Sequence, residues 1–459
     1  MATLLEPQPD TQPAVPTREP GPHQVRFDRL AKLAQDPPWV ASARKSAFAR
    51  FAALGFPTVQ DEDWRFTNVA PIGRLPFRPV FELTQNGLTA ESMKLFAFTG
   101  LEGSHLVFID GHFAPGLSAI PPRTERVRVC SLREALARNP AWVEPHLFRE
   151  AGNDPNAFTA LNTAFFLDGA FILVPAGQAV ANPVHLLFVA TGKENGATSH
   201  PRNLIVAERD SRLTVIESYV SLTDAACLTN TVTELLVGDH AGVEHLKLQD
   251  EGMQSFHVAH LAAWFGRSSR VISHSFALGA RLSRTGIRAH LAGPDLECVL
   301  NGLYLTKGQQ LADHHMVVEH AQPHCASHEY FNGILDDQSK GVFHGRILVQ
   351  PAAQQTDAKQ TNKNLLLSDD ATVNSKPQLE IYADDVKCTH GATVGQMDED
   401  AIFYLRTRGI GLETARRMLM HAFAGEIIDR VRCVPAREEL DRLVWHRLEQ
   451  NPHLATVGK

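Results

Sequence analysis

Short groups of apolar residues recur through the middle of the chain, beginning at about Ala170. They are separated by on the order of 10 to 20 residues, and many are followed by Gly, Asp or Asn. No convincing helical period joins one group to the next, so the pattern predicts strand after strand. The groups lie at residues 171–174, 184–189, 204–206, 213–216, 235–237, 243–248, 256–261, 271–276, 287–291, 298–305, 316–318, 330–335, 342–349 and 365–367.

Three architectures produce such a rhythm: a sandwich, a propeller and a coil of parallel strands. The strands are too numerous for one simple sandwich, and the chain shows no blade-length repeat with a fixed signature. Solenoid turns tolerate variable length, and stacking them buries a continuous core between successive turns. We therefore expect a mainly β protein with a coil of parallel strands over residues 169–396, whose two open ends need covering.

The first third of the chain is predicted to be mostly helical, after a Pro-rich disordered tail at residues 1–24. Apolar residues then recur at three- and four-residue steps, which is the helical period. We expect an N-terminal domain at residues 25–168. Its expected elements are helices within 25–54, at 131–137 and at 141–151, and a hairpin that turns at Asp110-Gly111.

Helical patterning returns after Gly395. Asp398 places acid at a helix start, Gly409 ends that helix, and Pro435 opens the last one. The final helix carries its leucines on one stripe, which predicts packing against the strand core. We expect residues 397–459 to form a helical C-terminal domain that covers one open end of the coil.

Composition excludes several classes of protein. A net charge of -7 argues against a general nucleic-acid binder. Six scattered cysteines without a Cys-x-x-Cys pair favour a reducing compartment over a disulfide framework. No apolar run approaches the roughly 20 residues that a spanning helix needs. We therefore expect a soluble, cytoplasmic protein without membrane segments.

The common catalytic signatures are missing from the sequence. There is neither a phosphate-binding Gly-x-x-x-x-Gly-Lys-Ser/Thr loop nor a Gly-x-Ser-x-Gly elbow. The pairs Asp336-Asp337 and Asp369-Asp370 lie in turn-like contexts, where they serve as strand ends more often than as glycosidase acids. The acidic segment 61–68 is interpreted as a helix start with packing aromatics. We expect no enzymatic activity of the chain itself.

Histidines are frequent in the predicted strands, and one cluster has the spacing of a helical metal site. On strands and turns, however, donors three to four residues apart point to different faces. The cluster is therefore interpreted as structural. Its members are His320, His324, Cys325 and His328.

The best candidate for metal chemistry is the pair Cys388 and His390. Alternation on a strand places both side chains on one face, two residues apart. A thiolate is a soft ligand, and imidazole suits iron, copper or zinc. Two donors do not complete a tetrahedral site, so another chain must supply the remaining ligands. Gly391 and Gly395 allow the close approach of another backbone.

The segment 384–395, with the sequence DDVKCTHGATVG, resembles the SufB/SufD family of the SUF iron-sulfur cluster assembly machinery, and within it SufD. Three further segments share this resemblance, which extends over the chain apart from the Pro-rich tail. SufB typically has His-Glu-Ala-Thr where this chain has His390-Gly391-Ala392-Thr393, and it lacks the cysteine two residues earlier. The further segments are 61–68 (DEDWRFTN), 330–335 (YFNGIL) and 403–409 (FYLRTRG).

The resemblance implies a right-handed parallel β-helix flanked by helical N- and C-terminal regions. It implies a heterodimer with a SufB-like paralogue and docking of a SufC-like ABC ATPase on the C-terminal helices. At the SufB interface, the residue matching His390 helps to hold a transient iron-sulfur cluster shared with SufB, and Cys388 is a further possible ligand. Reduced flavin is associated with such complexes, but this sequence shows no flavin motif.

These expectations define a non-catalytic scaffold subunit that assembles nascent iron-sulfur clusters with SufB, while ATP hydrolysis belongs to the partner SufC. Two alternatives stay open. In a purely structural dimerisation module, Cys388 and His390 would only pack. A β-helix enzyme acting on polysaccharide would need a cleft lined by carboxylates or a calcium site, and a secretion signal, none of which the sequence indicates.

Overall fold

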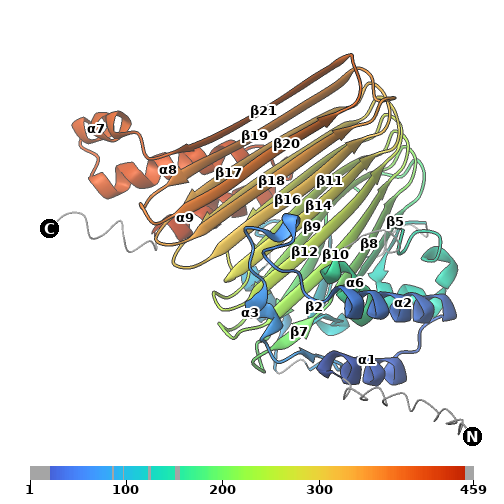
Figure 1. Cartoon of the computed structure of the whole chain (residues 1–459). Coiled ribbons are helices and arrows are strands. Elements are labelled where there is room, and N and C mark those ends of the chain that lie inside the picture. The colour runs from blue at the N-terminus through green and yellow to red at the C-terminus, as the bar shows by residue number, and fades with distance from the viewer. Residues whose placement is uncertain (1–20, 85–86, 97, 122–125, 150–155, 450–459) are drawn as a thin grey trace, which may run out of the picture.

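The computed structural model describes residues 21–84, 87–96, 98–121, 126–149 and 156–449. The protein is mostly β: a parallel solenoid of about 8 turns, with helices at both ends of the chain (Figure 1). This confirms the predicted coil of strands. Each turn contributes one strand to each of two facing sheets, so that neighbours within a sheet are every second strand of the chain. The expected tail lies largely outside the described residues, although helix α1 begins at Pro22.

We name the two layers sheet 1 and sheet 2. Sheet 1 contains β4 (Arg128–Ser131), β5 (Ala170–Val174), β8 (Arg202–Ala207), β10 (Leu228–Val237), β12 (Phe256–Phe265), β14 (Leu282–Leu291), β16 (Leu311–His320), β18 (Lys340–Val349) and β20 (Thr372–Ile381); β7 (Ala197–Ser199) also pairs with β10, and β1 (Arg78–Pro79) pairs with β7. Sheet 2 contains β3 (His112–Phe113), β2 (Ser104–Ile109), β6 (Val184–Ala190), β9 (Arg212–Ser221), β11 (Gly242–Asp250), β13 (Arg270–Ala277), β15 (Glu297–Thr306), β17 (Ala326–Leu335), β19 (Thr356–Leu366) and β21 (Val386–Gly395).

The interior between the sheets is formed by every second residue of each strand, and parallel pairing stacks equivalent positions turn upon turn. One part of this interior is apolar, with residues such as Leu186, Val215 and Phe331 fully or almost fully buried. Burial of such stacked apolar side chains stabilises a solenoid continuously along its axis.

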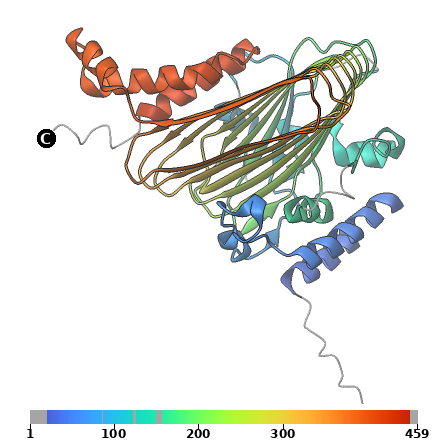
Figure 2. The ribbon, with the colours of Figure 1, turned by 45° about the horizontal axis from the view of Figure 1, so that its top comes forward.

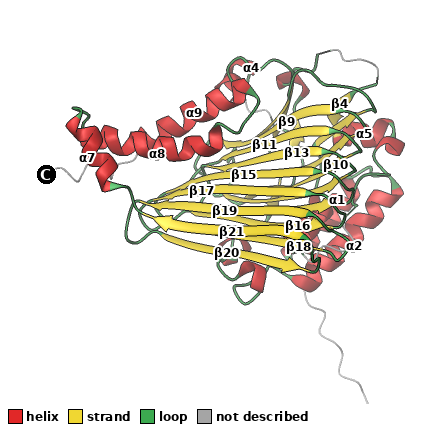
Figure 3. Ribbon diagram, turned by 90° about the horizontal axis from the view of Figure 1, so that it is seen from above, coloured by secondary structure: helices red, strands yellow, loops and turns green. Residues whose placement is uncertain are grey.

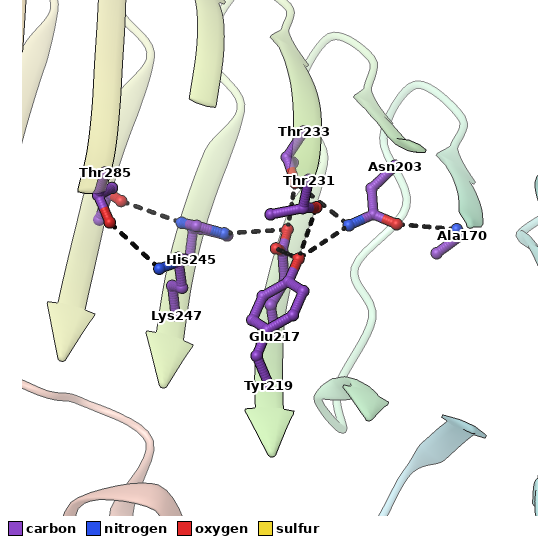
Figure 4. A network of polar contacts seen from close by, with 10 residues as sticks. Ala170, Asn203, Glu217, Tyr219, Thr231, Thr233, His245, Lys247 and Thr285 are labelled. Atoms are coloured by element: carbon purple, nitrogen blue, oxygen red, sulfur yellow. Dashed lines mark hydrogen bonds and ion pairs between the residues drawn. The ribbon is translucent and has the colours of Figure 1, made fainter. Parts of the chain in front are cut away.

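Another part of the interior is polar. Figure 4 shows the carboxylate of Glu217 accepting hydrogen bonds from Tyr219 (2.7 Å) and Thr233 (2.8 Å), while Lys247 donates to Thr285 (3.2 Å). Burial lowers the pKa of Lys247 to about 8. Such polar inward positions explain why the strands run longer than the apolar groups that predicted them: β10 begins at Leu228, well before its apolar group at 235–237.

Most of the N-terminal helices cover the outer face of sheet 1, whereas the segment around Met93 packs on sheet 2. Helix α6 (Ala157–Phe165) packs on β10 and on α2 (Pro38–Leu54), and Trp64 joins a cluster with Val258 and Leu282 on the outer face of sheet 1. The hairpin prediction is confirmed, because Asp110 and Gly111 connect β2 and β3 with φ angles of 49° and 87°. The prediction of a helix at 141–151 is wrong for residues 141–149, where only the 3-10 turn η4 (Pro140–Trp142) forms; residues 150–151 lie outside the described part.

The helical elements of this region are short apart from its first two helices. They are α1 (Pro22–Leu33), α2 (Pro38–Leu54), η1 (Glu62–Trp64), α3 (Ala70–Gly73), α4 (Ala90–Met93), η2 (Lys94–Phe96), η3 (Pro115–Leu117), α5 (Leu132–Arg138), η4 (Pro140–Trp142) and α6 (Ala157–Phe165).

The C-terminal helices α7 (Glu399–Thr407), α8 (Leu412–Ile428) and α9 (Val434–Glu449) form as predicted, with Asp398 capping α7. Their expected position over the open end is wrong. Instead α8 and α9 pack on the outer face of sheet 2, on the side of the solenoid opposite α1, α2 and α6 (Figures 2 and 3). The reason is an apolar strip on that face, including Leu246 and Ile334, which the helices bury.

Candidate functional site

Cys388 and His390 lie on β21, the last strand of sheet 2. In the parallel register, Ala358 of β19 pairs with Cys388 and Gln360 pairs with His390. Ala358 and Gln360 are buried inside the solenoid, whereas their neighbours Asp357 and Lys359 are exposed. Because paired residues of a parallel ladder share a face, Cys388 and His390 point toward the solenoid interior. The sequence prediction that they share one face is confirmed.

The interior of this last turn is open. Within the described part of the chain, β21 pairs only with β19 and β20 only with β18. In Figure 1, β21 forms the uppermost edge of the solenoid, with no element drawn above it. The inward side chain of His390 is consequently exposed, although the equivalent position one turn earlier is buried.

Cys388 is half-buried at this open end. Its side chain packs against a small apolar cluster that includes Val349, Ala358 and Ala383. Burial raises the pKa of the Cys388 thiol, and the nearby Asp357 carboxylate adds to this effect. The thiol is therefore protonated at neutral pH, and binding a metal would require it to release its proton.

A column of polar side chains extends inward from His390. Gln360 lies directly beneath it, and Glu329 lies one turn further in, on β17. Burial raises the pKa of Glu329 to about 8. On the facing strand, a Cβ at Gly345 would lie 2.5 Å from Gln360 Nε2 and 2.9 Å from Glu329 Oε2. Only glycine leaves room for this column.

The open end also exposes backbone and apolar surface. Val394 on β21 is 53% exposed and Ile381 at the end of β20 is 38% exposed. A Cβ on Gly391 or Gly395 would meet none of the described atoms within 4 Å. An uncovered strand edge beside exposed apolar side chains is a surface suited to accept strands from another chain.

The structure separates the members of the histidine cluster, as the structural interpretation predicts. His320 is buried and contacts Ser327 Oγ at 2.8 Å, whereas His328 faces outward, 3.9 Å from Asp357. His324 occupies a turn with a φ of 61°, and the Cys325 thiol donates to the Gly293 carbonyl at 3.3 Å. Their donor atoms do not converge on one point.

One convergence of donors escaped sequence reasoning. Asp63, His315 and His344 each place a ligand atom within 4.8 Å of the others, and they are the one such group found among the described residues. If the pairing of β16 with β18 had been known, the strand register would have placed His315 beside His344, but it would not have predicted the third donor. The contribution of Asp63 depends on where the segment 61–68 folds, which no sequence spacing indicates.

Two family models match this chain. The SufBD protein N-terminal region matches residues 29–186, and the core domain described as "SUF system FeS cluster assembly, SufBD core domain" matches residues 188–423. The boundary between them falls close to the start of the solenoid, within its first turns. No described helix is long and apolar enough to cross a membrane.

Curated relatives agree with these matches. The Escherichia coli iron-sulfur cluster assembly protein SufD is 32% identical over 86% of this chain and 90% of its own length. An iron-sulfur cluster assembly SufBD family protein of Synechocystis is 32% identical over 89% of this chain and 93% of its own. SufD of Bacillus subtilis is 23% identical over 90% and 95% of the two chains.

A two-sheet parallel solenoid with these matches defines the class: the chain belongs to the SufBD family of the SUF iron-sulfur cluster assembly system. Its relatives named SufD place it among the SufD-type assembly proteins. These relatives are named as assembly proteins and not as enzymes.

Proposed function

We propose that this chain is a non-catalytic scaffold subunit that pairs with a SufB-type paralogue and builds nascent iron-sulfur clusters at the shared face. The open last turn is the observation that carries this proposal. It combines unpaired strand edges, exposed apolar side chains and the two inward donors Cys388 and His390 in one place. A partner that continues the two sheets would bury all of them together.

In this proposal Cys388 and His390 supply part of a ligand set, and the paralogue supplies the rest. A cluster needs about four protein donors, usually thiolates, and two donors on one strand cannot provide them. The cluster is cargo, assembled and then passed on. The resemblance also associates reduced flavin with such complexes, but the proposal assigns no residue of this chain to flavin binding.

The C-terminal helices are proposed to dock the SufC-type ATPase. Helices α8 and α9 bury one face against sheet 2, where Lys363 forms an ion pair with Glu426 at 2.8 Å and Asn332 donates to the Phe423 carbonyl at 2.9 Å. Their other face stays exposed, including Met418, and α7 exposes Phe403 and Tyr404. ATP hydrolysis would then move a rigid solenoid through helices anchored on its side.

The two alternatives have different structural requirements. A cleft of about 830 Å³ has carboxylates on its wall, as a polysaccharide-active enzyme would need. However, Asp337 Oδ2 accepts the Gly308 N–H at 2.8 Å and Asp336 Oδ1 accepts the Asp337 N–H at 2.9 Å, so these groups already serve the turns. A purely structural module needs only the open edge and gives no role to His390.

The deciding experiment is anaerobic co-expression with the SufB-type and SufC-type partners, followed by visible absorption and iron and sulfide analysis. We expect His390→Ala to assemble into the complex but to carry little cluster. His240→Asn is the matched control, because His240 is also exposed and Asn tolerates its φ of 59°. If the His390 variant carries as much cluster as the wild type, His390 is not a cluster ligand and the chain contributes only structure to the complex.

A further inference from the structure

A second group of potential metal ligands lies on the outer face of sheet 1. It is separate from Cys388 and His390, which lie on the inner face of sheet 2. His315 of β16 pairs directly with His344 of β18, and their rings meet edge to face with centroids 4.2 Å apart. Asp63 approaches them from the N-terminal region, with its Oδ1 3.6 Å from His315 Nε2. Ligand atoms bound at about 2.0–2.2 Å in a tetrahedral shell lie about 3.3–3.6 Å apart.

The loop that presents Asp63 is held firmly against the sheet. Arg284 Nη2 donates to the Asp63 carbonyl at 2.9 Å, and its guanidinium lies 3.8 Å from the Trp64 ring centre. On the far side of the loop, Thr67 Oγ1 donates to Asp313 Oδ2 at 2.5 Å. These contacts hold the backbone of Asp63 beside the two imidazoles, and its carboxylate reaches His315 from there.

The electrostatic surroundings permit a divalent cation. The nearby cations are each engaged by a carboxylate: Arg284 by Asp313, Arg346 by Glu380 and Lys376 by Glu62.

Hydrogen bonding also orients one of the ligands. His344 Nε2 lies 3.4 Å from the Gln378 side-chain oxygen. If Nε2–H donates to that oxygen, Nδ1 carries the lone pair, which is the arrangement by which a second residue orients a metal-bound histidine. His315 Nδ1 is buried and has no hydrogen-bond partner among the described residues, while Nε2 faces Asp63.

The geometry points to a binding site for one divalent first-row transition metal, held by Asp63, His315 and His344. Two imidazoles and one carboxylate form a donor set that suits Fe(II), Zn(II) and Co(II), and three ligands leave further positions open. These positions would face a cleft of about 560 Å³ that the same loop forms with β12, β14 and β16. A small anionic or neutral ligand of the metal could enter there.

The test uses the metal-free full chain without partners, so its outcome is independent of cluster assembly. Co²⁺ is added and its visible absorption followed, and Zn²⁺ affinity is measured by competition with a chromophoric chelator. We expect one site that weakens at least about tenfold in Asp63→Asn and in His315→Ala. The exposed side chain of Asp63 makes its variant safe for folding, which thermal unfolding would check.

His240→Asn, at an exposed histidine outside both groups of donors, should leave the Co²⁺ spectrum and the Zn²⁺ affinity unchanged. His390→Ala tests whether the strongest site belongs to the open end of the solenoid instead. Gln378→Ala should weaken binding because His344 loses its orienting partner. Equal binding in Asp63→Asn and wild type, or loss of the strongest site in His390→Ala, would overturn the assignment.

Discussion

His390 lies directly above Gln360 in the register of β21 on β19, yet Gln360 is 1% exposed while His390 is open to solvent. The two positions are equivalent in the repeat and differ only in whether another turn covers them. The polar column that continues inward to Glu329 therefore ends at an uncovered surface.

Val394→Asp should weaken association with the SufB-type partner at least about tenfold, which corresponds to about 1.4 kcal/mol. The reason is that docking would bury an unpaired carboxylate in place of an apolar side chain. Analytical ultracentrifugation or interferometry with the purified partner measures this effect. Val25→Asp, at a valine that is 51% exposed on α1, is the matched control and should bind normally. Equal weakening by both variants would argue against a specific role of the open end.

Glu329 should make the protein less stable as pH rises. Its folded pKa of about 8 lies above the ordinary value of 4.5, so between these pH values the folded state holds a proton that the unfolded state has lost. The free energy of unfolding should fall through this window by up to about 1.4 kcal/mol per pH unit. Glu329→Gln should remove that fall.

Urea unfolding between pH 5 and pH 8 checks this expectation. Glu102→Gln, at an exposed carboxylate, should keep the pH dependence of the wild type. A Glu329→Gln variant with an unaltered slope would show that Glu329 ionises normally within the fold.

Arg202→Met should cost about 3–5 kcal/mol of the free energy of unfolding. Arg202 and Glu234 form a fully buried ion pair, and Arg202 Nη1 also donates to Thr163 of α6 at 3.0 Å. Removing the guanidinium leaves a buried carboxylate without its counter-charge. Arg270→Met breaks the exposed pair with Glu297 and should cost only about 0–1 kcal/mol. Denaturant unfolding of both variants provides the comparison, and similar losses would contradict it.

Met418→Glu should weaken binding of the SufC-type ATPase without changing thermal stability. Met418 is 39% exposed on α8, on the side turned away from sheet 2, so a charge there disturbs docking and not packing. Calorimetric titration with the ATPase measures the affinity. Leu95→Glu, at an exposed leucine of the N-terminal region, should bind like the wild type. Unchanged binding in Met418→Glu would remove α8 from the docking surface.

Much of the local structure could be predicted from short segments. The turn at Asp110-Gly111 forms because both positions take positive φ, and α7 starts at Asp398 because its carboxylate accepts the Asp400 and Ala401 N–H groups. The helix expected around residues 141–151 failed because Pro145 lies in its middle, has no N–H to donate and disfavours the helical conformation of Glu144; Phe148 also takes a positive φ of 64°.

The position of the C-terminal helices could not be predicted in the same way. Their apolar stripes indicate that they pack on something, but the same stripes would fit the open end or the side of the solenoid equally well. The helices pack on the side because Leu246 and Ile334 point outward from sheet 2 and form part of an apolar strip there. This strip exists only because turns that are far apart in the sequence stack in register.

The sequence by itself determined that this chain forms a coil of strands with helices at each end, and that Cys388 and His390 share one face of a strand. Both follow from short-range periodicity, which acts within a few residues. Only the tertiary structure decided that this face belongs to an uncovered last turn, and that Asp63 meets His315 and His344. Those outcomes depend on which turns stack and which loop packs on the sheet, and contacts between distant segments are not encoded in any local spacing.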